Sequence, residues 1–336
     1  MHFISVDWGT SSFRARLVDR SKRKIIQTIS SLEGCKILAR SAPVKEIDRE
    51  QFFTVFLAEK LLKLGEEAVN RNSLCPIIIS GMASSAIGLR NLPYAKAPCW
   101  LSPEALLVDS NLSLPAPFEG SRVLLVSGLS SSDNVMRGEE CELLGLIDLL
   151  AIPNDGRTRH VVLPGTHSKQ VALAGHRLLS FRTYMTGELF ELISKHSVLS
   201  VTLNQDSAPL RDSDQREIED RCLESIIAGL GLSSLFHIRA RHLLEDCCGD
   251  QAKYALSVLL IGLELAALAQ QTAANSSAVI IAGSTTISDI YVRLARRLLP
   301  AADLTVIQST ILDATVVRGH QLILDYLASP QARQRD

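Results

Sequence analysis

The sequence lacks several features that whole classes of proteins require. Lys and Arg number 35 against 36 Asp and Glu, which gives a net charge of -1 and no strong field for holding a polyanion. Aromatic residues make up only 5% of the chain, and no basic stripe interleaved with aromatics occurs. We therefore expect no nucleic-acid partner.

Disulfide, zinc and membrane signals are also missing. The seven cysteines form no C-x-x-C pair, and none has a His at zinc-finger spacing, which predicts reduced thiols. The adjacent Cys247 and Cys248 are either a redox pair or two small residues in a loop or helix end. No uncharged apolar run of about 18 to 20 residues occurs, and no signal peptide precedes the first strand. We expect a cytoplasmic protein that has no membrane partner.

The length and the apolar patterns predict a two-domain α/β protein. A chain of 336 residues exceeds the usual size of one core. Strand patterns, alternating or apolar throughout, occur at 2–7, 13–19, 25–30, PIIISGM, SRVLLVSGL, RHVVLPG and SAVIIAGST. Helical periodicity occurs at 49–71, 135–150, 214–231, 251–274 and 314–328.

Two similar turns interrupt strands, one near the start of each half of the chain. They are DWGTSS at residues 7–12 and GTHSK at residues 165–169. The backbone N–H groups of such turns favour anions, and the Thr and Ser hydroxyls add donors. Asp7 would repel a bare phosphate, so its presence suggests Mg²⁺ between the carboxylate and a phosphate. One copy is also compatible with an ordinary hairpin turn, whereas two copies indicate an internal duplication and a nucleotide-phosphate site.

A third candidate for nucleotide binding, after the two turns, is the junction VIIAGSTTISDIY, in which Gly283 and Ser284 follow an apolar strand. Backbone exposed by a glycine at such a junction can pack against a flat adenine ring. A plain strand-to-helix turn is the alternative.

Taken together, the segments DWGTSSFRARL, NVMRGEECELLG, LPGTHSK, FRTYMTGELFELISKHS, LLIGLELA and IIAGST resemble the 2-dehydro-3-deoxygalactonokinase family. That family belongs to the actin, hexokinase and Hsp70 superfamily. The resemblance implies two ribonuclease H-like duplicated lobes with an interlobe cleft, as in actin-like ATPases. It also implies ATP-dependent phosphorylation, with Mg²⁺, of the C6 hydroxyl of a 2-keto-3-deoxy sugar acid in carbohydrate acid catabolism.

The resemblance also predicts the domain boundaries. An N-terminal lobe over 1–152 would hold the first phosphate loop and the sugar acid. A C-terminal lobe over 153–314 would hold the second phosphate loop and the adenosine motif. Residues 315–336 would form a C-terminal helix, for which packing against the N-terminal lobe is one option. Either a monomer or a homodimer fits the sequence.

The resemblance to this family also implies which residues bind the nucleotide. Asp7 would bind the metal, and Lys169 would approach a phosphate as a point charge. His167 would either orient a phosphate or serve as scaffold. The residues expected to bind ATP are Gly9, Thr10, Ser11, Ser12, Gly165, Thr166, His167, Ser168, Gly283 and Ser284.

Phosphoryl transfer to an alcohol also needs a group that accepts the hydroxyl proton. The motif MRGEECELLG resembles the segment that carries the base of sugar kinases, which makes Glu139 the first candidate, followed by Glu140 and Asp133. These carboxylates are otherwise typical of a solvated helix face.

A sugar acid needs a cation for its carboxylate, and the planar fork of Arg suits two oxygens. Arg182 ranks first among the arginines in the family motifs, because hydrogen-bonding side chains lie beside it. Interior salt bridges are the alternative for each arginine. The expected substrate-binding residues are Arg14, Gly34, Met82, Ser84, Arg137, Arg182, Thr183, Thr186 and Glu188.

The loop GMASSAIGLRNLPY departs from the family pattern after Gly81 and Met82, which leaves the exact sugar acid open.

Two other functional classes share the fold. One is a phosphohydrolase of the exopolyphosphatase type, in which a Glu activates water. The other is a non-catalytic sensor of sugars or nucleotides. The FRTYMTGE segment and the missing basic field favour the kinase.

Overall fold

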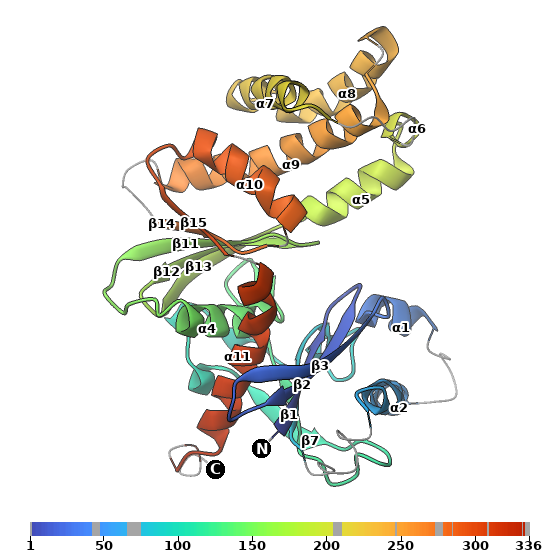
Figure 1. Ribbon diagram of the computed structural model, residues 1–336, viewed down its shortest axis with the longest axis vertical. Helices are drawn as coiled ribbons and strands as arrows, with labels where there is room; N and C mark the ends of the chain where they lie inside the picture. Colours follow the sequence, from blue (N-terminus) through green and yellow to red (C-terminus); the bar gives the residue numbers. More distant parts are fainter. Residues whose placement is uncertain are drawn as a thin grey trace. The chain divides into compact units, whose positions relative to one another are not determined.

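A computed structural model of the chain describes residues 2–41, 48–65, 75–203, 210–245, 247–272, 278–283, 285–307, 309–330 and 332 (Figure 1). The chain divides into two compact units. Unit 1 comprises Met1–Gly156, Ala174–Ser180 and Thr310–Asp336, and unit 2 comprises Arg157–Leu173 and Phe181–Ser309. The boundaries expected after residues 152 and 314 stay a prediction.

Unit 1 is built on a mixed sheet in the order β3-β2-β1-β4-β8-β7. The first three strands pair antiparallel, while β4 runs parallel to both β1 and β8. The strands are β1 (His2–Trp8), β2 (Phe13–Asp19), β3 (Lys24–Ser31), β4 (Ile77–Gly81), β8 (Val123–Val126) and the antiparallel edge strand β7 (Val108–Leu112). Every residue of β4 and β8 is buried, which explains their continuous apolar sequences.

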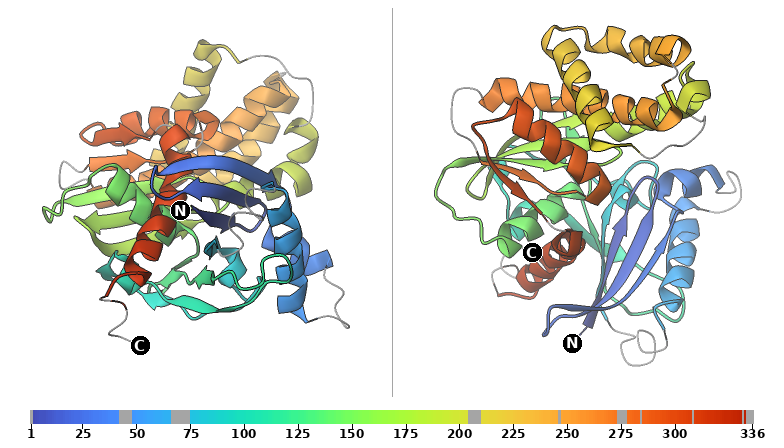
Figure 2. Two further views of the ribbon diagram at one scale, coloured as in Figure 1. Left: turned by 60° about the horizontal axis from the view of Figure 1, so that its bottom comes forward. Right: turned by 45° about the horizontal axis from the view of Figure 1, so that its top comes forward.

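Helices pack on both faces of this sheet (Figure 2). On one face Trp8 contacts Phe53 and Phe56 of α2, whose first turn is capped by the side chain of Asp48. On the other face the Ser5 hydroxyl is 2.8 Å from Nδ1 of His320 in α11. The helices of unit 1 are α1 (Cys35–Ser41), α2 (Arg49–Leu62), α4 (Glu139–Leu149) and α11 (Ser309–Leu327), with short 3-10 helices η1 (Met82–Ser84) and η2 (Pro103–Ala105).

Glycines allow α4 and α11 to cross closely. A Cβ atom at Gly145 would lie 1.8 Å from the carbonyl oxygen of Thr315, and one at Gly319 would lie 2.0 Å from that of Cys141. A methyl group at either position would therefore push the helices apart. A small sheet in the order β10-β9-β5 completes the unit, with strands β5 (Ala95–Lys96), β9 (Leu129–Ser130) and β10 (Val135–Met136).

The sheet of unit 2 repeats the strand order of unit 1. Its order is β15-β14-β11-β12-β13, so the first strand again lies between the second and the fourth. The strands are β11 (Thr158–Leu163), β12 (Ser168–Ala174), β13 (Arg177–Tyr184), β14 (Ala278–Ile281) and β15 (Asp303–Val306), and β6 (Cys99–Trp100) pairs with the start of β13. This repetition agrees with the predicted duplication, and the predicted α/β class is confirmed.

Helix α9 forms the centre of the helical layer in unit 2. It lies between the sheet and helices α7 and α8, and it also contacts α5, α6 and α10 (Figure 1). The helices are α5 (Thr186–His196), α6 (Ser200–Leu203), α7 (Asp212–Ile227), α8 (Gly231–Glu245), α9 (Gly249–Thr272) and α10 (Thr285–Leu298). Among the described residues, α9 alone is long and apolar enough to cross a membrane, and 56% of its apolar window is buried inside the structure.

One predicted helix is wrong at its start. The apolar pattern predicts a helix from residue 135, but Val135 and Met136 form strand β10 and α4 begins at Glu139. Gly138 separates them with a φ of 105°, which side chains other than glycine rarely adopt. The glycine therefore places Glu139 in the first turn of α4. Helix α8 has no counterpart among the predicted elements.

Candidate active site

The first predicted phosphate turn is a tight loop supported by the start of α1. The Gly9 N–H donates to the Ser12 carbonyl oxygen at 2.9 Å, which closes the turn between β1 and β2. The N–H of Cys35 donates to the carbonyl oxygen of Gly9 at 3.0 Å. A Cβ atom at Gly34 would lie 2.3 Å from the carbonyl oxygen of Thr10, so this contact requires glycine. Gly34 therefore packs directly against the backbone of the turn.

Asp7 stands at the end of β1 among charged neighbours. Its Oδ2 lies 4.0 Å from Nη1 of Arg14, its partner in the β1–β2 register, and its side chain is 27% exposed. Burial raises the pKa of Asp7, the positive charges of Arg16 and Arg14 oppose this, and the negative charge of Glu139 adds to it. Asp7 and Glu139 are therefore close enough in unit 1 for their charges to interact.

Three backbone segments meet where these two carboxylates lie. A Cβ atom at Gly81, the last residue of β4, would lie 2.7 Å from the carbonyl oxygen of Trp8. One at Gly138 would lie 3.2 Å from Cα of Gly81. The ends of β1 and β4 and the start of α4 therefore lie next to one another. Met82 directly follows β4 in the chain.

The two carboxylates at the start of α4 have different environments. Glu140 is fully buried, and both of its oxygens accept from the Gly138 N–H at 2.8 Å. Burial, together with the charge of Glu139, raises the pKa of Glu140 to about 8. Glu139 is partly exposed and accepts from the N–H of Arg137 at 3.0 Å. Glu140 is therefore mainly protonated at neutral pH.

Asp133 is exposed on the loop before this helix. Hydrogen bonds from Asn134, Ser131 and Ser132 lower its pKa. A carboxylate of this kind holds a proton weakly.

The Arg137 side chain is bound to the loop that follows β4. Its Nη1 donates to the carbonyl and the hydroxyl oxygen of Ser84, and its Nη2 donates to the carbonyl oxygen of Leu92 at 2.8 Å. The guanidinium also lies 4.0 Å from the centre of the Tyr94 ring. Both Arg137 and Ser84 are thus engaged with the protein itself.

The second turn, in unit 2, packs against the start of α5. Gly165 and Thr166 are exposed, and the Thr166 carbonyl oxygen accepts from the N–H of Glu188 at 3.0 Å. The Glu188 carboxylate lies 2.8 Å from Nε2 of His167. A Cβ atom at Gly187 would lie 2.6 Å from the Gly165 carbonyl oxygen, so the two segments touch.

Unit 2 also holds a buried carboxylate that the sequence did not single out. Glu264 of α9 is 1% exposed and accepts from the hydroxyls of Ser168 and Thr186, each at 2.6 Å, and from that of Tyr291 at 2.7 Å. These bonds join the second turn to α9 and α10. The sequence feature that could have indicated this buried carboxylate is the single Glu within the apolar run LLIGLELAALA.

Two further predicted residues adjoin this turn. Lys169 lies in β12, is 3% exposed, and donates from Nζ to the carbonyl oxygen of His167 at 2.7 Å. A Cβ atom at Gly283 would lie 2.9 Å from Cγ of Pro164, which places the glycine beside the start of the turn. Ser284 lies outside the described residues.

The remaining predicted residues lie at the end of β13. Arg182 is exposed and Thr183 is partly exposed. Burial raises the pKa of Tyr184, and a hydrogen bond with Arg182 opposes this. The residues predicted for the sugar acid thus occur in both units.

The two units share a strand order and a similar turn, and unit 1 brings the charges of Asp7 and Glu139 close together, an arrangement that suits phosphoryl transfer. A sequence profile described as 2-keto-3-deoxy-galactonokinase matches residues 7–317. The chain belongs to the 2-keto-3-deoxy-galactonokinase family, and it is a sugar-acid kinase.

Individual relatives agree with this assignment. A protein of Rhizobium meliloti (strain 1021) assigned as a 2-dehydro-3-deoxygalactonokinase is 33% identical over 79% of each chain. The 2-dehydro-3-deoxygalactonokinase of Escherichia coli (strain K12) is 28% identical over 84% of this chain and 85% of its own. A crystal structure from Sinorhizobium meliloti, assigned to the same activity, superposes with a TM-score of 0.76 at 28% identity, covering 97% of this chain and 99% of that one.

Proposed function

We propose that the protein transfers the γ-phosphoryl group of ATP to the C6 hydroxyl of 2-dehydro-3-deoxygalactonate, with Glu139 as the base. The observation that carries the proposal is the meeting of β1, β4 and α4 in unit 1, which brings the charges of Asp7 and Glu139 within interacting range. Transfer to an alcohol requires one group for the proton and positive charge for the phosphates.

Glu139 suits the role of base better than the other two carboxylates. Glu140 already holds a proton at neutral pH and is fully buried. Asp133 has a lowered pKa and is therefore a weak proton acceptor. Glu139 is partly exposed, and the Arg137 N–H orients its carboxylate at the start of α4.

Asp7 fits a role as a ligand of Mg²⁺. Mg²⁺ usually takes one or two carboxylates and completes its shell with water and substrate phosphates. Asp7 is a partly exposed carboxylate whose pKa is raised by burial, so a cation beside it would favour the charged form. Among the described residues no group of three or more His, Cys, Asp or Glu forms a ready cage, which suits an ion carried with ATP. When bound, Mg²⁺ supplies positive charge to the phosphate oxygens.

Each of the two turns is suited to binding phosphate in its own unit. Residues 10–12 carry hydroxyls and backbone N–H groups next to Gly34, which packs against the turn. Residues 165–167 present a second set, and Glu264 holds Ser168 at the end of that turn. Gly283, beside Pro164, is proposed to contact the adenosine.

Arg182 is proposed to bind the carboxylate of the sugar acid, with Thr183 and Glu188 nearby in the chain as partners for hydroxyls. The exposed guanidinium of Arg182 offers two parallel donors. Arg137 is proposed instead to fix the loop around Ser84 beside the sugar acid, because its Nη1 and Nη2 already donate to Ser84 and Leu92.

The test replaces Glu139 by Gln and measures ADP release with the sugar acid in a coupled assay. Loss of a positioned base should lower kcat by about a hundredfold or more, while ATP binding, followed by nucleotide titration, stays close to wild type. Asp133→Asn is the matched control, and it should keep wild-type turnover.

The outcomes separate the alternatives. An unchanged kcat in Glu139→Gln removes Glu139 from the mechanism. Phosphate release that does not need the sugar acid would indicate a hydrolase, and the absence of both reactions would indicate a sensor.

A further inference from the structure

The two carboxylate oxygens of Glu264 bind different segments of unit 2. Oε1 accepts from the hydroxyl of Ser168, at the end of the second turn, at 2.6 Å. Oε2 accepts from the hydroxyl of Thr186, the first residue of α5, at 2.6 Å, and from that of Tyr291 in α10 at 2.7 Å. One side chain therefore joins the turn that is proposed to hold phosphate to the start of α5.

A buried carboxylate at this position needs a reason, because burying one is unfavourable unless hydrogen bonds offset the cost. Glu264 is 1% exposed, and burial raises its pKa although hydrogen bonds from the three hydroxyls oppose this. A carboxylate has two acceptor oxygens, whereas the amide of Gln has one acceptor oxygen and an NH₂ donor. Packing alone does not call for a carboxylate here, but the joining of several hydroxyl groups does.

The backbone of Glu264 is held on two sides. Its carbonyl oxygen accepts from the side-chain amide of Gln170 in β12 at 2.8 Å, which ties it to the sheet. A Cβ atom at Gly262 would lie 2.6 Å from Cδ1 of Ile226, so α9 touches α7 beside Glu264. The carboxylate therefore extends from a fixed part of α9.

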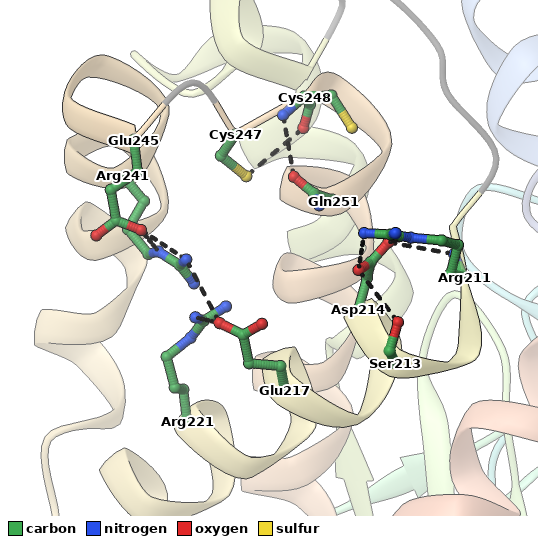
Figure 3. Close-up of polar contacts among 10 residues, drawn as sticks. All are labelled: Arg211, Ser213, Asp214, Glu217, Arg221, Arg241, Glu245, Cys247, Cys248 and Gln251. Carbon is green, nitrogen blue, oxygen red and sulfur yellow. Dashed lines mark hydrogen bonds and ion pairs between the residues drawn. The ribbon is translucent and has the colours of Figure 1, made fainter.

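The outer helices of unit 2 add to this support. A Cβ atom at Gly231 of α8 would lie 2.6 Å from Cδ2 of Leu263, so α8 also touches α9 next to Glu264. Glu217 of α7 pairs with Arg241 of α8 at 3.9 Å, and Arg241 pairs with Glu245 at 2.6 Å (Figure 3). Both helices that cover α9 are thus joined to each other.

The start of α5 lies against the second turn and follows the strand that carries Arg182. A Cβ atom at Gly187 would lie 2.6 Å from the carbonyl oxygen of Gly165, so the two backbones touch. Arg182, which is proposed to bind the sugar acid, lies near the end of β13, and α5 begins four residues later at Thr186. A shift of the turn would therefore also move the segment that follows Arg182.

We propose that Glu264 is a positioning residue that couples the binding of ATP to the binding of the sugar acid. It acts through Ser168 and Thr186, by fixing the second turn and the start of α5 in one arrangement. The inference rests on the phosphate and sugar-acid roles proposed above for these segments. A nucleotide bound at the turn then holds α5 in the arrangement that suits the sugar acid, and by linkage each ligand raises the affinity for the other by the same factor.

The test is isothermal titration calorimetry of the full chain with the nonhydrolysable ATP analogue AMP-PNP and Mg²⁺, with and without saturating 2-dehydro-3-deoxygalactonate. In wild type the sugar acid should tighten binding of the analogue about tenfold or more. Glu264→Gln should reduce this coupling factor to about twofold or less, because an amide cannot accept from hydroxyls on both sides. The titrations involve no phosphoryl transfer, so they do not depend on Glu139 as the base.

Two control variants separate coupling from stability. Glu219 is a second buried carboxylate of unit 2, 4% exposed, which accepts from the hydroxyl of Tyr254 at 2.6 Å and from Nε of Arg293 at 2.8 Å. Glu219→Gln should lower the free energy of unfolding in urea, as Glu264→Gln does, but keep the wild-type coupling factor. Tyr291→Phe removes only the bond to α10 and should also keep it.

A third variant tests the path through α5. Thr186→Val removes the hydroxyl at the start of α5, so it should lower the coupling factor as much as Glu264→Gln, and the double variant should lower it no further. The inference is overturned if wild type shows no coupling, if Glu264→Gln keeps it, if Glu219→Gln loses it equally, or if the two changes add. Wild-type protein that binds neither ligand would overturn the proposed function as well, whereas binding of both without coupling would overturn this inference alone.

Discussion

The wild-type protein should become less stable as the pH rises, because Glu140 is buried. Replacing Glu140 by Gln should abolish this pH dependence. Burial and the charge of Glu139 raise the pKa of Glu140 from 4.5 to about 8. Between these two values the folded chain keeps the proton that the unfolded chain has released. The free energy of unfolding therefore falls as the pH rises through this window, by about 1.4 kcal/mol per pH unit and by roughly 5 kcal/mol in total.

The assay is urea unfolding of both proteins at several pH values from about 5 to about 8. Gln has the shape of the protonated acid, and its oxygen can still accept from the Gly138 N–H. In the variant, the free energy of unfolding should therefore fall less steeply with pH, and near pH 8 the variant should be more stable than wild type. Asp133→Asn is the control, because the lowered pKa of Asp133 contributes stability that is lost only at more acidic pH. Parallel slopes for wild type and Glu140→Gln would refute the reasoning.

Two arginine replacements test how the sugar acid is bound. Arg182→Leu should raise the KM for the sugar acid about tenfold or more, because a charge-assisted pair is lost, while the KM for ATP stays the same. Equal effects on both substrates would contradict a carboxylate-binding role. Arg137→Lys keeps the charge but cannot span the carbonyl oxygens of Ser84 and Leu92, so it should weaken discrimination between galactonate-derived and gluconate-derived acids. Unchanged discrimination in steady-state assays of both acids would contradict a positioning role.

Much of the fold follows from local patterns in the sequence. The strands β1, β2 and β4 match their predicted spans closely, because alternation and apolar β-branched runs are local signals. The start of α4 was placed too early, since the apolar Val135 and Met136 were assigned to the helix, whereas the positive φ of Gly138 separates them from it. Helix α8 was missed because its exposed leucines blur the usual contrast between an apolar and a polar face.

The sequence located the two turns but not the bonds that hold them. The Gly and Thr of each turn are visible in DWGTSS and GTHSK, because a turn is a local feature. The contact of Gly34 with Thr10 and the bond between Ser168 and Glu264 join residues far apart in the chain. The raised pKa of Glu140 was equally hidden, because burial causes it and burial depends on the whole unit.

The duplication gives the two turns the same scaffold but different chemistry. When Gly9 is matched with Gly165, Asp7 corresponds to Leu163, which is 4% exposed at the end of β11. Unit 2 therefore has no carboxylate at the position of Asp7, the proposed metal ligand of unit 1. Its own carboxylate, Glu264, is turned inward onto Ser168. If Asp7 binds Mg²⁺ and the second turn binds phosphate directly, Asp7→Asn should raise the Mg²⁺ concentration needed for activity and leave the metal-free affinity for ADP nearly unchanged.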